Sequence, residues 1–417
     1  MRSTQTNLSA ACAALLAGAA ATSAPAQTGT WAFPEGSFDP SGSGFAPYAT
    51  LRAAACAAEA TPERVVLLGT GAYHEALTLD GPLTLRAQGG PATIGTGAAD
   101  ATSFTVETYN THLFGEIPSL LEDIMIFFGL LEHPLTWQDD QRASRIGALF
   151  TGAGHDVVGL QEVWNDGLWQ VIRNASGQPR SFYGDQKGQG VSIPVFGAIP
   201  DQLHSGLGIL SPLPIAASQY IYARETGIPE ALSAKSYIAA HVVKGSFAVG
   251  IFMTHLQAGS EFDSDVRGAR ASQLLELRQA VLSFRLANPD SPVIIMGDLN
   301  IRGSGDPTSE YQQNLLTMFD LEGFIDAARE DFCNRPRNGV TSSRDNDLNR
   351  YFDPQTSDAR LDYVLYAPSA DGRVRLILRE VETLDHMGPT ALSEKGLVTR
   401  RLSDHYGVRA KFDLIRR

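Results

Sequence analysis

Hydrophobic residues follow two alternating patterns from about Ser103 to the end of the chain. Continuous apolar runs, such as Val293 to Met296, alternate with segments whose apolar residues recur every three or four positions. Runs of the first kind predict strands buried on both faces, and segments of the second kind predict helices. Predicted strands lie in "SFTVETYN", "DVVGLQEV", "YIAAHVVKGSFAVGIFMTHL", "PVIIMGDLN", "LDYVLY" and "YGVRAKFDL", and predicted helices at 140–150 and 266–287. The third strand segment turns at Lys244-Gly245, which predicts a hairpin. Strands packed beneath covering helices predict a layered α/β sandwich of about 300 residues.

The segment from residue 28 to about residue 100 differs in composition from the rest of the chain. It is rich in Gly, Ala and Thr, and Gly-containing turns separate three short predicted strands at 65–68, 76–79 and 83–86. It resembles the opening rungs of right-handed parallel β-helix proteins, which follow a short helix like the one predicted at 48–58. One or two rungs do not bury a solenoid core. We therefore predict a small β-rich cap packed on the main domain, 101–417.

Residues 1–27 predict a secretory signal and hence a secreted or periplasmic protein. One Arg precedes an Ala/Leu-rich run that ends at Ala24-Pro25-Ala26, a typical cleavage site. The alternative is a disordered Ala-rich leader. Cleavage would remove Cys12 and leave Cys56 and Cys333, which either pair in an oxidising compartment or remain two buried thiols. No later segment is long and apolar enough to span a bilayer, so we predict no transmembrane segment.

The formal net charge of the chain is −13. A negative field opposes long-range attraction to polyanions and so disfavours nucleic acid as a substrate. This argument is mild, because a bound divalent cation can reverse the field inside a cleft.

Polar side chains stand at the ends of several predicted strands, where a buried strand has no need of them. Turn chemistry alone accounts for one such residue, because Gly, Asp and Asn are common where strands stop. Together these residues supply oxygen ligands for Mg²⁺, two imidazoles that exchange protons near neutral pH, and amide donors for an anionic oxygen. The polar residues are Asn110, Glu162, His255, Asp298 with Asn300, and Asp404 with His405.

Eight short motifs occur in an order that resembles the endonuclease/exonuclease/phosphatase superfamily, and within it the secreted neutral sphingomyelinases. They are "TYN", "LQEVW", "SGLGILSPLPI", "KSYIAAHV", "THLQAG", "GDLN", "RLDYVLY" and "SDHYGV". The resemblance implies the DNase I-like fold, a four-layer sandwich of two packed mixed β-sheets flanked by helices. It also implies a phosphodiesterase that uses Mg²⁺, with Mn²⁺ or Co²⁺ as alternative metals.

The resemblance further implies a metal site and a catalytic base. Glu162 is expected to be the principal Mg²⁺ ligand, with Asn110 completing the site or orienting the metal-bound waters. His405 is expected to take a proton from the attacking water. Asp362 of "RLDY" matches the carboxylate that holds this imidazole, although an ion pair with Arg360 is an alternative for it.

The remaining motif residues are expected to surround the phosphate. Asp298 would help to set the nucleophile or the leaving group, while Asn300 and His255 would bind the non-bridging oxygens. Asp404 would lie beside the metal and its waters, or else cap the turn before the last strand. His112, two residues after Asn110, has no role that the sequence decides. The resemblance allows a second metal at the cleft edge, but we do not assign Asp166 to it, because "NDG" is also an ordinary turn.

An apolar segment at 117–131 bears on the substrate. Its residues are apolar on nearly every helical side, so a helix there is either enclosed by protein or in contact with lipid. A second apolar segment, "VSIPVFGAIP", has the same two interpretations. Lipid contact favours a secreted phospholipase C acting as a monomer on a sphingomyelin-like phospholipid at a membrane surface. The alternatives are an extracellular DNase I-like endonuclease and a fold kept only as a binding module; we find no basic, aromatic-rich run that would favour the nuclease.

Overall fold

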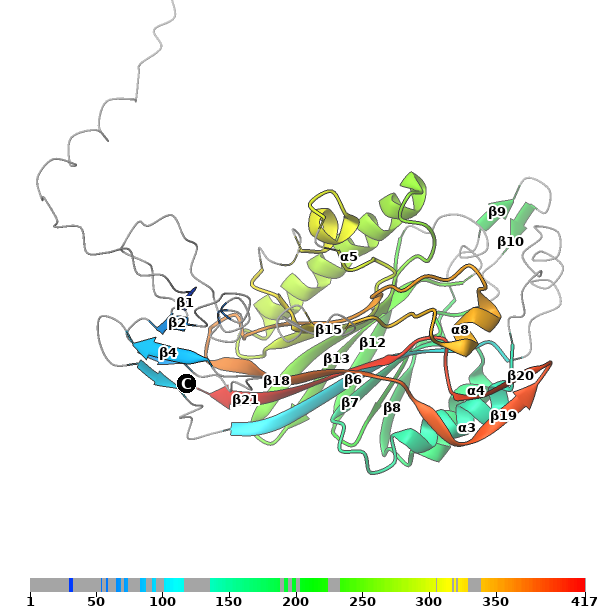
Figure 1. Ribbon diagram of the computed structural model, residues 1–417, viewed down its shortest axis with the longest axis horizontal. Helices are drawn as coiled ribbons and strands as arrows, with labels where there is room; N and C mark the ends of the chain where they lie inside the picture. The colour runs from blue at the N-terminus through cyan, green and yellow to red at the C-terminus, as the bar shows by residue number, and fades with distance from the viewer. Residues whose placement is uncertain are drawn as a thin grey trace, which may run out of the picture.

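Two six-stranded mixed β-sheets pack face to face in the computed structural model, with helices on the outer side of each sheet (Figure 1). This arrangement confirms the predicted four-layer α/β sandwich. The structure describes residues 101–115, 136–187, 203–223, 233–304, 306–316, 322–328 and 339–416, together with residue 319 and short pieces at 191–193, 197–199 and before residue 95.

The first sheet has the strand order β18-β21-β6-β7-β11-β8. Strands β6 and β7 are parallel, and the other neighbouring pairs are antiparallel. The strands are β18 (Val374–Leu384), β21 (Gly407–Arg416), β6 (Ala101–Leu113), β7 (Val157–Val163), β11 (Gly208–Ser211) and β8 (Arg180–Tyr183).

The second sheet has the strand order β12-β13-β14-β15-β17-β16. Here β14 and β15 are the parallel pair. The predicted hairpin is present, because β13 and β14 are antiparallel and the chain turns at Gly245, whose φ is 60°. The strands are β12 (Ile215–Ile221), β13 (Ser236–Lys244), β14 (Phe247–His255), β15 (Val293–Asp298), β17 (Asp362–Ala367) and β16 (Ile325–Asp326).

The main hydrophobic core lies between the two sheets. Side chains such as Val106 and Phe412 from the first sheet meet Met253, Met296 and Val364 from the second. Every residue of β15 is buried, as its continuous apolar run predicts. The rigid strands that carry the polar residues are therefore fixed by packing on both faces.

Helices cover the two outer faces. Helices α3 (Asp139–Leu149) and α4 (Asp166–Ser176) lie on the first sheet, and α5 (Ser264–Ala287) and a π-helix (Tyr311–Leu316) lie on the second (Figure 1). The predicted helices at 140–150 and 266–287 are thus present as α3 and α5. A short helix, α8 (Asp347–Phe352), and the hairpin of β19 (Met387–Glu394) and β20 (Leu397–Arg401) lie at one end of the sandwich.

Short parallel strands precede the sandwich. Strands β1, β2 and β4 form one parallel sheet, and β3 pairs with β5 in another. Strands β2 and β4 match two of the three predicted strands; the third, at 76–79, lies outside the described residues. The five strands are β1 (Thr30–Ala32), β2 (Val65–Leu68), β3 (Gly71–Tyr73), β4 (Thr84–Ala87) and β5 (Ala92–Ile94).

Several predicted features fall outside the described residues. They are the signal at 1–27, the apolar segment at 117–131, Cys56 and Cys333. The second apolar segment is described in part, as an antiparallel pair of strands, β9 (Val191–Ile193) and β10 (Gly197–Ile199). Within the described part of the chain, no helix has the length and apolar character needed to cross a membrane.

Candidate active site

The polar residues predicted from strand ends meet at one edge of the sandwich. Each sheet contributes one parallel pair, and the carboxyl ends of parallel strands lie at the same edge. In the second sheet, Asp298 stands between two partners in register, His255 on β14 and Asp362 on β17. The first sheet brings Asn110 and Glu162 from β6 and β7 to the same place.

Asn110 joins the two sheets through its side-chain amide. Its Nδ2 donates one hydrogen bond to Glu162 Oε1 at 2.8 Å and another to Asp298 Oδ2 at 2.9 Å. A single amide therefore holds two carboxylates from different sheets toward each other. This contact places Asn110 beside Glu162, and its expected role toward a metal or its bound waters stays a prediction.

His405 and Asp362 form a buried imidazole–carboxylate pair. His405 Nδ1 lies 2.8 Å from Asp362 Oδ2. The backbone N–H of Asp362 is bound to the hydroxyl of Thr341, which fixes the start of β17. The alternative partner, Arg360, pairs with Asp326 at 2.8 Å. With Nδ1 engaged, the Nε2 atom of His405 is the ring nitrogen left for a substrate or water.

His255 is buried between the carboxylates of both sheets. Its Nε2 lies 3.8 Å from Glu162 Oε1 and 3.7 Å from Asp298 Oδ2, beyond hydrogen-bond distance. Both of its ring nitrogens lack a hydrogen-bond partner within the described residues. Buried polar atoms are normally bonded, so these nitrogens are suited to receive a ligand.

Asn300 closes the turn after β15. Its backbone N–H bonds Asp298 Oδ1 at 2.9 Å, and its side-chain amide donates to the carbonyl of Leu256 at 3.2 Å. Gly297, just before, has a φ of 146°, and a Cβ there would lie 1.9 Å from the carbonyl oxygen of Thr254. Only glycine fits this close approach of two strands. The "GDLN" motif is therefore required by backbone geometry as well as by its polar side chains.

The site contains groups with opposite pKa shifts. Burial and the neighbouring charge of Asp362 raise the pKa of Asp298 to about 7. Burial also lowers the pKa of His255 well below its usual value, and the positive charge of Lys235 adds to this effect. For His405, burial acts in the lowering direction, but the adjacent carboxylates of Asp362 and Asp298 outweigh it and raise its pKa. Because the pKa values of these groups are shifted in opposite directions, one group can hold a proton while another accepts one.

Asp404 and His112 lie together beside Glu162. Asp404 accepts a hydrogen bond from the Ser403 hydroxyl at 3.0 Å, and its other oxygen lies 3.2 Å from His112 Nδ1. The same nitrogen lies 3.5 Å from Glu162 Oε2. The structure thus brings all eight predicted site residues to one edge, and it adds His112, whose place the sequence left open.

The donor set fits a hard divalent cation. One oxygen of Glu162, one of Asp298 and a nitrogen of His255 lie within 4.8 Å of one another. Carboxylate oxygens are the preferred ligands of Mg²⁺, and a ring nitrogen of His255 that has no hydrogen-bond partner within the described residues adds a further donor.

The segment 341–346, which no sequence motif links to the site, supports the site through hydrogen bonds. Asn346 donates through Nδ2 to the carbonyls of Ser403 and Asp404, both at 3.0 Å, while its Oδ1 caps α8. The hydroxyl of Thr341 accepts from the backbone N–H groups of Leu361 and Asp362. The Asn before "DL" signals a helix start, but nothing in the local sequence indicates these distant partners.

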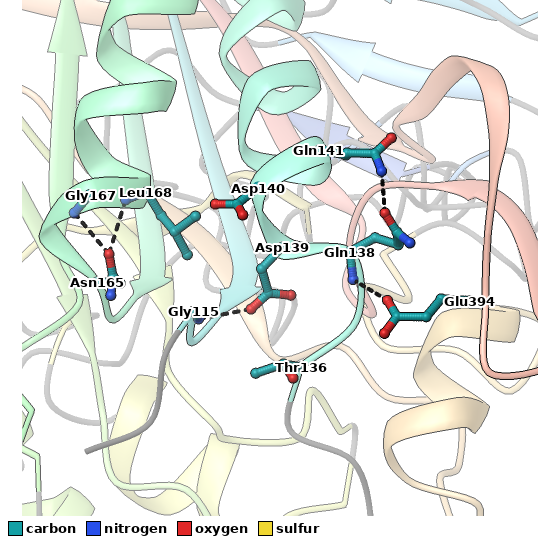
Figure 2. Close-up of a pocket in the computed structure, with 10 residues that line it drawn as sticks. All are labelled: Gly115, Thr136, Gln138, Asp139, Asp140, Gln141, Asn165, Gly167, Leu168 and Glu394. Atoms are coloured by element: carbon teal, nitrogen blue, oxygen red, sulfur yellow. Dashed lines mark hydrogen bonds between the residues drawn. The ribbon is translucent and has the colours of Figure 1, made fainter. Parts of the chain in front are cut away.

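A polar cavity of about 630 Å³ opens next to the site, between the N-terminal ends of α3 and α4 and the tip of the β19–β20 hairpin (Figure 2). Asn165 caps α4, and Asp139 at the start of α3 accepts from the N–H of Gly115. Glu394 accepts from the N–H of Gln138. The predicted catalytic residues do not line this cavity.

Comparison with known protein families assigns the chain to a family. A model of the Endonuclease/Exonuclease/phosphatase family matches residues 108–405. The chain belongs to this family. A search of curated proteins finds no match.

Solved structures of similar fold cover most of this Endonuclease/Exonuclease/phosphatase protein. A beta toxin double mutant from Staphylococcus aureus, with bound magnesium ions, is 19% identical with a TM-score of 0.54, covering 74% of this chain and 99% of its own. Sphingomyelinase C from Streptomyces griseocarneus is 22% identical with a TM-score of 0.50, covering 74% and 99%. TDP2 from D. rerio, complexed with single strand DNA product, is 17% identical with a TM-score of 0.51, covering 75% and 99%. These likenesses confirm the fold expected from the motifs.

Proposed function

We propose that the protein is a secreted, magnesium-dependent phosphodiesterase of the neutral sphingomyelinase type. In this role it is a phospholipase C that cleaves sphingomyelin or a related lipid and leaves the phosphate on the headgroup. The observation that carries the proposal is the amide of Asn110 bridging Glu162 and Asp298, beside the His405–Asp362 pair. A carboxylate site for a cation next to an oriented imidazole suits hydrolysis of a phosphodiester by water.

The cation, Mg²⁺, would be held by Glu162, with Asn110 completing the site or orienting the metal-bound waters, and when bound it would neutralise charge that builds on the phosphate oxygens. The protein's own groups perform the proton transfers. His405 accepts the proton of the attacking water on Nε2, while Asp362 keeps the ring oriented through Nδ1. Asp298, 4.0 Å from His405 Nδ1, helps to set the attacking water or the leaving oxygen as the bond from that oxygen to phosphorus breaks. His255 and Asn300, both beside Asp298, would bind the non-bridging oxygens.

Lipid is the preferred substrate class for two reasons. The net charge of −13 disfavours a polyanion, and the apolar segment at 117–131 directly follows the strand that carries Asn110. The structural neighbours include both a sphingomyelinase and a protein solved with a DNA product, so an extracellular endonuclease is the competing proposal.

The deciding experiment compares two substrates in one Mg²⁺ buffer. Release of phosphocholine from sphingomyelin vesicles is measured beside nicking of plasmid DNA, with EDTA added to a parallel sample. We expect lipid hydrolysis that EDTA abolishes, and little or no cleavage of DNA. Plasmid cleavage without phosphocholine release would replace the lipid proposal with the nuclease.

A further inference from the structure

His112 lies where the pairing of strand β6 with β7 becomes irregular. The pairing of β6 with β7 shifts register between Asn110 and Leu113, and His112 has a φ of 48°. A bulge next to a site commonly re-aims a side chain. The shift places the imidazole of His112 against the carboxylates of the site.

The ring of His112 contacts two carboxylates through one atom. Its Nδ1 lies 3.2 Å from Asp404 Oδ2 and 3.5 Å from Glu162 Oε2. The ring is stacked on Phe352 of α8, with centroids 3.9 Å apart and an interplanar angle of 26°. Phe114 meets the ring edge-on at 5.2 Å. Two aromatic contacts therefore fix the direction in which Nδ1 points.

The other ring nitrogen of His112 is in a different environment. Nε2 is buried and has no hydrogen-bond partner within the described residues. A buried donor without an acceptor is costly, so the proton of the ring belongs on Nδ1, where two carboxylates accept it. Nδ1 is then a donor whether the ring is neutral or charged.

The backbone of His112 is held as firmly as its ring. Arg142, which is fully buried, donates to the carbonyls of Thr111, His112 and Leu402. Its guanidinium also pairs with Asp139 at 2.7 Å. Such extensive support of one strained residue is expected where its side chain must keep a defined position.

We propose that His112 is a positioning residue for the metal site, whose Nδ1–H holds the carboxylates of Glu162 and Asp404 in the arrangement that receives the cation. The inference rests on the proposed function, because it assigns a role toward the metal that Glu162 would bind. Without this donor the two carboxylates repel each other and Glu162 turns away. Removal of an outer partner of a metal ligand typically weakens metal binding by about 10–100-fold.

The test uses three substitutions of His112 that separate the donor from the backbone and the ring. His112→Asn keeps a donor near the position of Nδ1 and tolerates positive φ. His112→Gly tolerates the backbone conformation but has no donor. His112→Phe keeps the stacking on Phe352 but also has no donor. Mg²⁺ binding is measured by titration calorimetry, and melting temperature in EDTA reports whether each variant is folded.

We expect His112→Gly and His112→Phe to bind Mg²⁺ about tenfold more weakly, and His112→Asn to stay within about threefold of the wild type. The Mg²⁺ concentration for half-maximal hydrolysis of bis(p-nitrophenyl) phosphate should rise in parallel, with a smaller change in kcat at saturating Mg²⁺. Unchanged Mg²⁺ binding in either donorless variant that folds would overturn the proposal, as would equal loss in His112→Asn. If neither folds, His112→Leu replaces them under the same criteria. A wild type that neither binds Mg²⁺ nor cleaves the diester would instead refute the proposed function and this inference with it.

Discussion

Three residues at the candidate site hold left-handed backbone conformations: His112, Glu162 and Asn300 have φ values of 48°, 55° and 52°. Each costs about 1–3 kcal/mol in a residue other than glycine and persists only where the surroundings enforce it. Because three of the five such non-glycine residues in the described chain lie here, the strain is concentrated where groups must be aimed.

The role of Glu162 can be tested with Glu162→Gln. The amide keeps the size of the side chain and can still accept from Asn110, but it lacks the charge that a divalent cation requires. We expect hydrolysis to fall by at least about 100-fold, with the melting temperature in EDTA nearly unchanged. Calorimetric titration with Mg²⁺ gives the direct measurement. Normal turnover at ordinary Mg²⁺ concentrations would remove Glu162 from the metal site.

The roles proposed for His405 and Asp362 predict which of two substitutions lowers activity more. His405→Ala removes the proton acceptor and should nearly abolish hydrolysis, while Asp362→Asn leaves the imidazole in place but less well oriented. The rate at saturating substrate should therefore be lower for His405→Ala, by about tenfold or more. The roles assigned here would be wrong if Asp362→Asn proved the more damaging change. Circular dichroism of both variants checks that the fold is retained.

At the residue scale, the sequence identified side chains but not their contacts. Seven of the eight predicted residues were recognisable as polar residues at the ends of apolar strands, and Asp362 only through the "RLDY" motif; all eight lie at one edge of the sandwich. The sequence left the partner of Asp362 open between His405 and Arg360, and left Asp404 open between the metal site and a turn cap. Only the spatial arrangement of distant segments decides such pairings.

At the element scale, the segment around α8 controls the loop that carries Asp404 and His405. Asn346→Ala would remove the helix cap and two hydrogen bonds to that loop. We expect a loss of about 1–3 kcal/mol in the free energy of unfolding and a clear loss of activity. Urea unfolding and diester hydrolysis measure the two effects.

Asn349→Ala is the matched control for this prediction. Asn349 is also buried, and it bonds the hydroxyl of Ser342 at 2.8 Å and the carbonyl of Ser343 at 3.3 Å, but neither Ser403 nor Asp404, although Ser342 forms a backbone bridge with His405. A similar loss of stability with a smaller loss of activity is expected. Equal losses of activity would mean that α8 supports the site only through general stability.

The apolar segment at 117–131 allows a test of whether the protein contacts lipid. Phe127→Ser combined with Phe128→Ser should weaken binding to sphingomyelin vesicles if these side chains touch lipid, while hydrolysis of a soluble diester stays unchanged. If the segment is core, the double change costs several kcal/mol and lowers the melting temperature and every activity together. A stable variant with full activity on vesicles would contradict lipid docking.

The type of each element with a strong local pattern was predictable from the sequence. The order of the strands in the two sheets was not. The buried run of β15, the hairpin at Gly245 and helices α3 and α5 follow from periodicity and turn residues. The insertion of β21 between β18 and β6 does not, because it depends on segments remote in sequence. Local patterns determine what an element is, whereas strand order depends on how all the elements pack.

At the scale of the whole molecule, one buried ion cluster lies away from the site. Glu107 of β6 is fully buried, with His155 Nε2 at 2.8 Å and His386 Nε2 at 2.5 Å. Burial alone would raise the pKa of Glu107, but the hydrogen bonds and charges of the two histidines outweigh it and lower the pKa to about 2. The cluster connects the first strand of the sandwich to the segments before β7 and β19.

This cluster predicts a dependence of stability on pH. The pKa of Glu107 is lower in the folded state than its usual 4.5, so its contribution is complete above about pH 4.5 and is lost as the pH falls toward 2. A shift of this size corresponds to about 3 kcal/mol. Glu107→Gln should therefore reduce the free energy of unfolding at pH 7, and the difference from wild type should shrink between pH 4.5 and 3, as measured with urea.

The control for this prediction is Glu380→Gln. Glu380 pairs with Lys411 at 2.6 Å, but both side chains are exposed to solvent. An exposed pair contributes at most about 1 kcal/mol, so this variant should be close to wild type at every pH. A Glu380→Gln variant as unstable as Glu107→Gln would show that burial is not the source of the effect.

The position of β21 between β18 and β6 affects when the candidate site can form during synthesis. This strand pairs with β6 between Val408 and Thr108, about 300 residues apart, and His405 immediately precedes it. A growing chain can form local hairpins early, but the first sheet stays open on one side of β6 until β21 has left the ribosome. Until then the imidazole of His405 has no fixed neighbour, so the candidate site is not assembled before β21 has emerged.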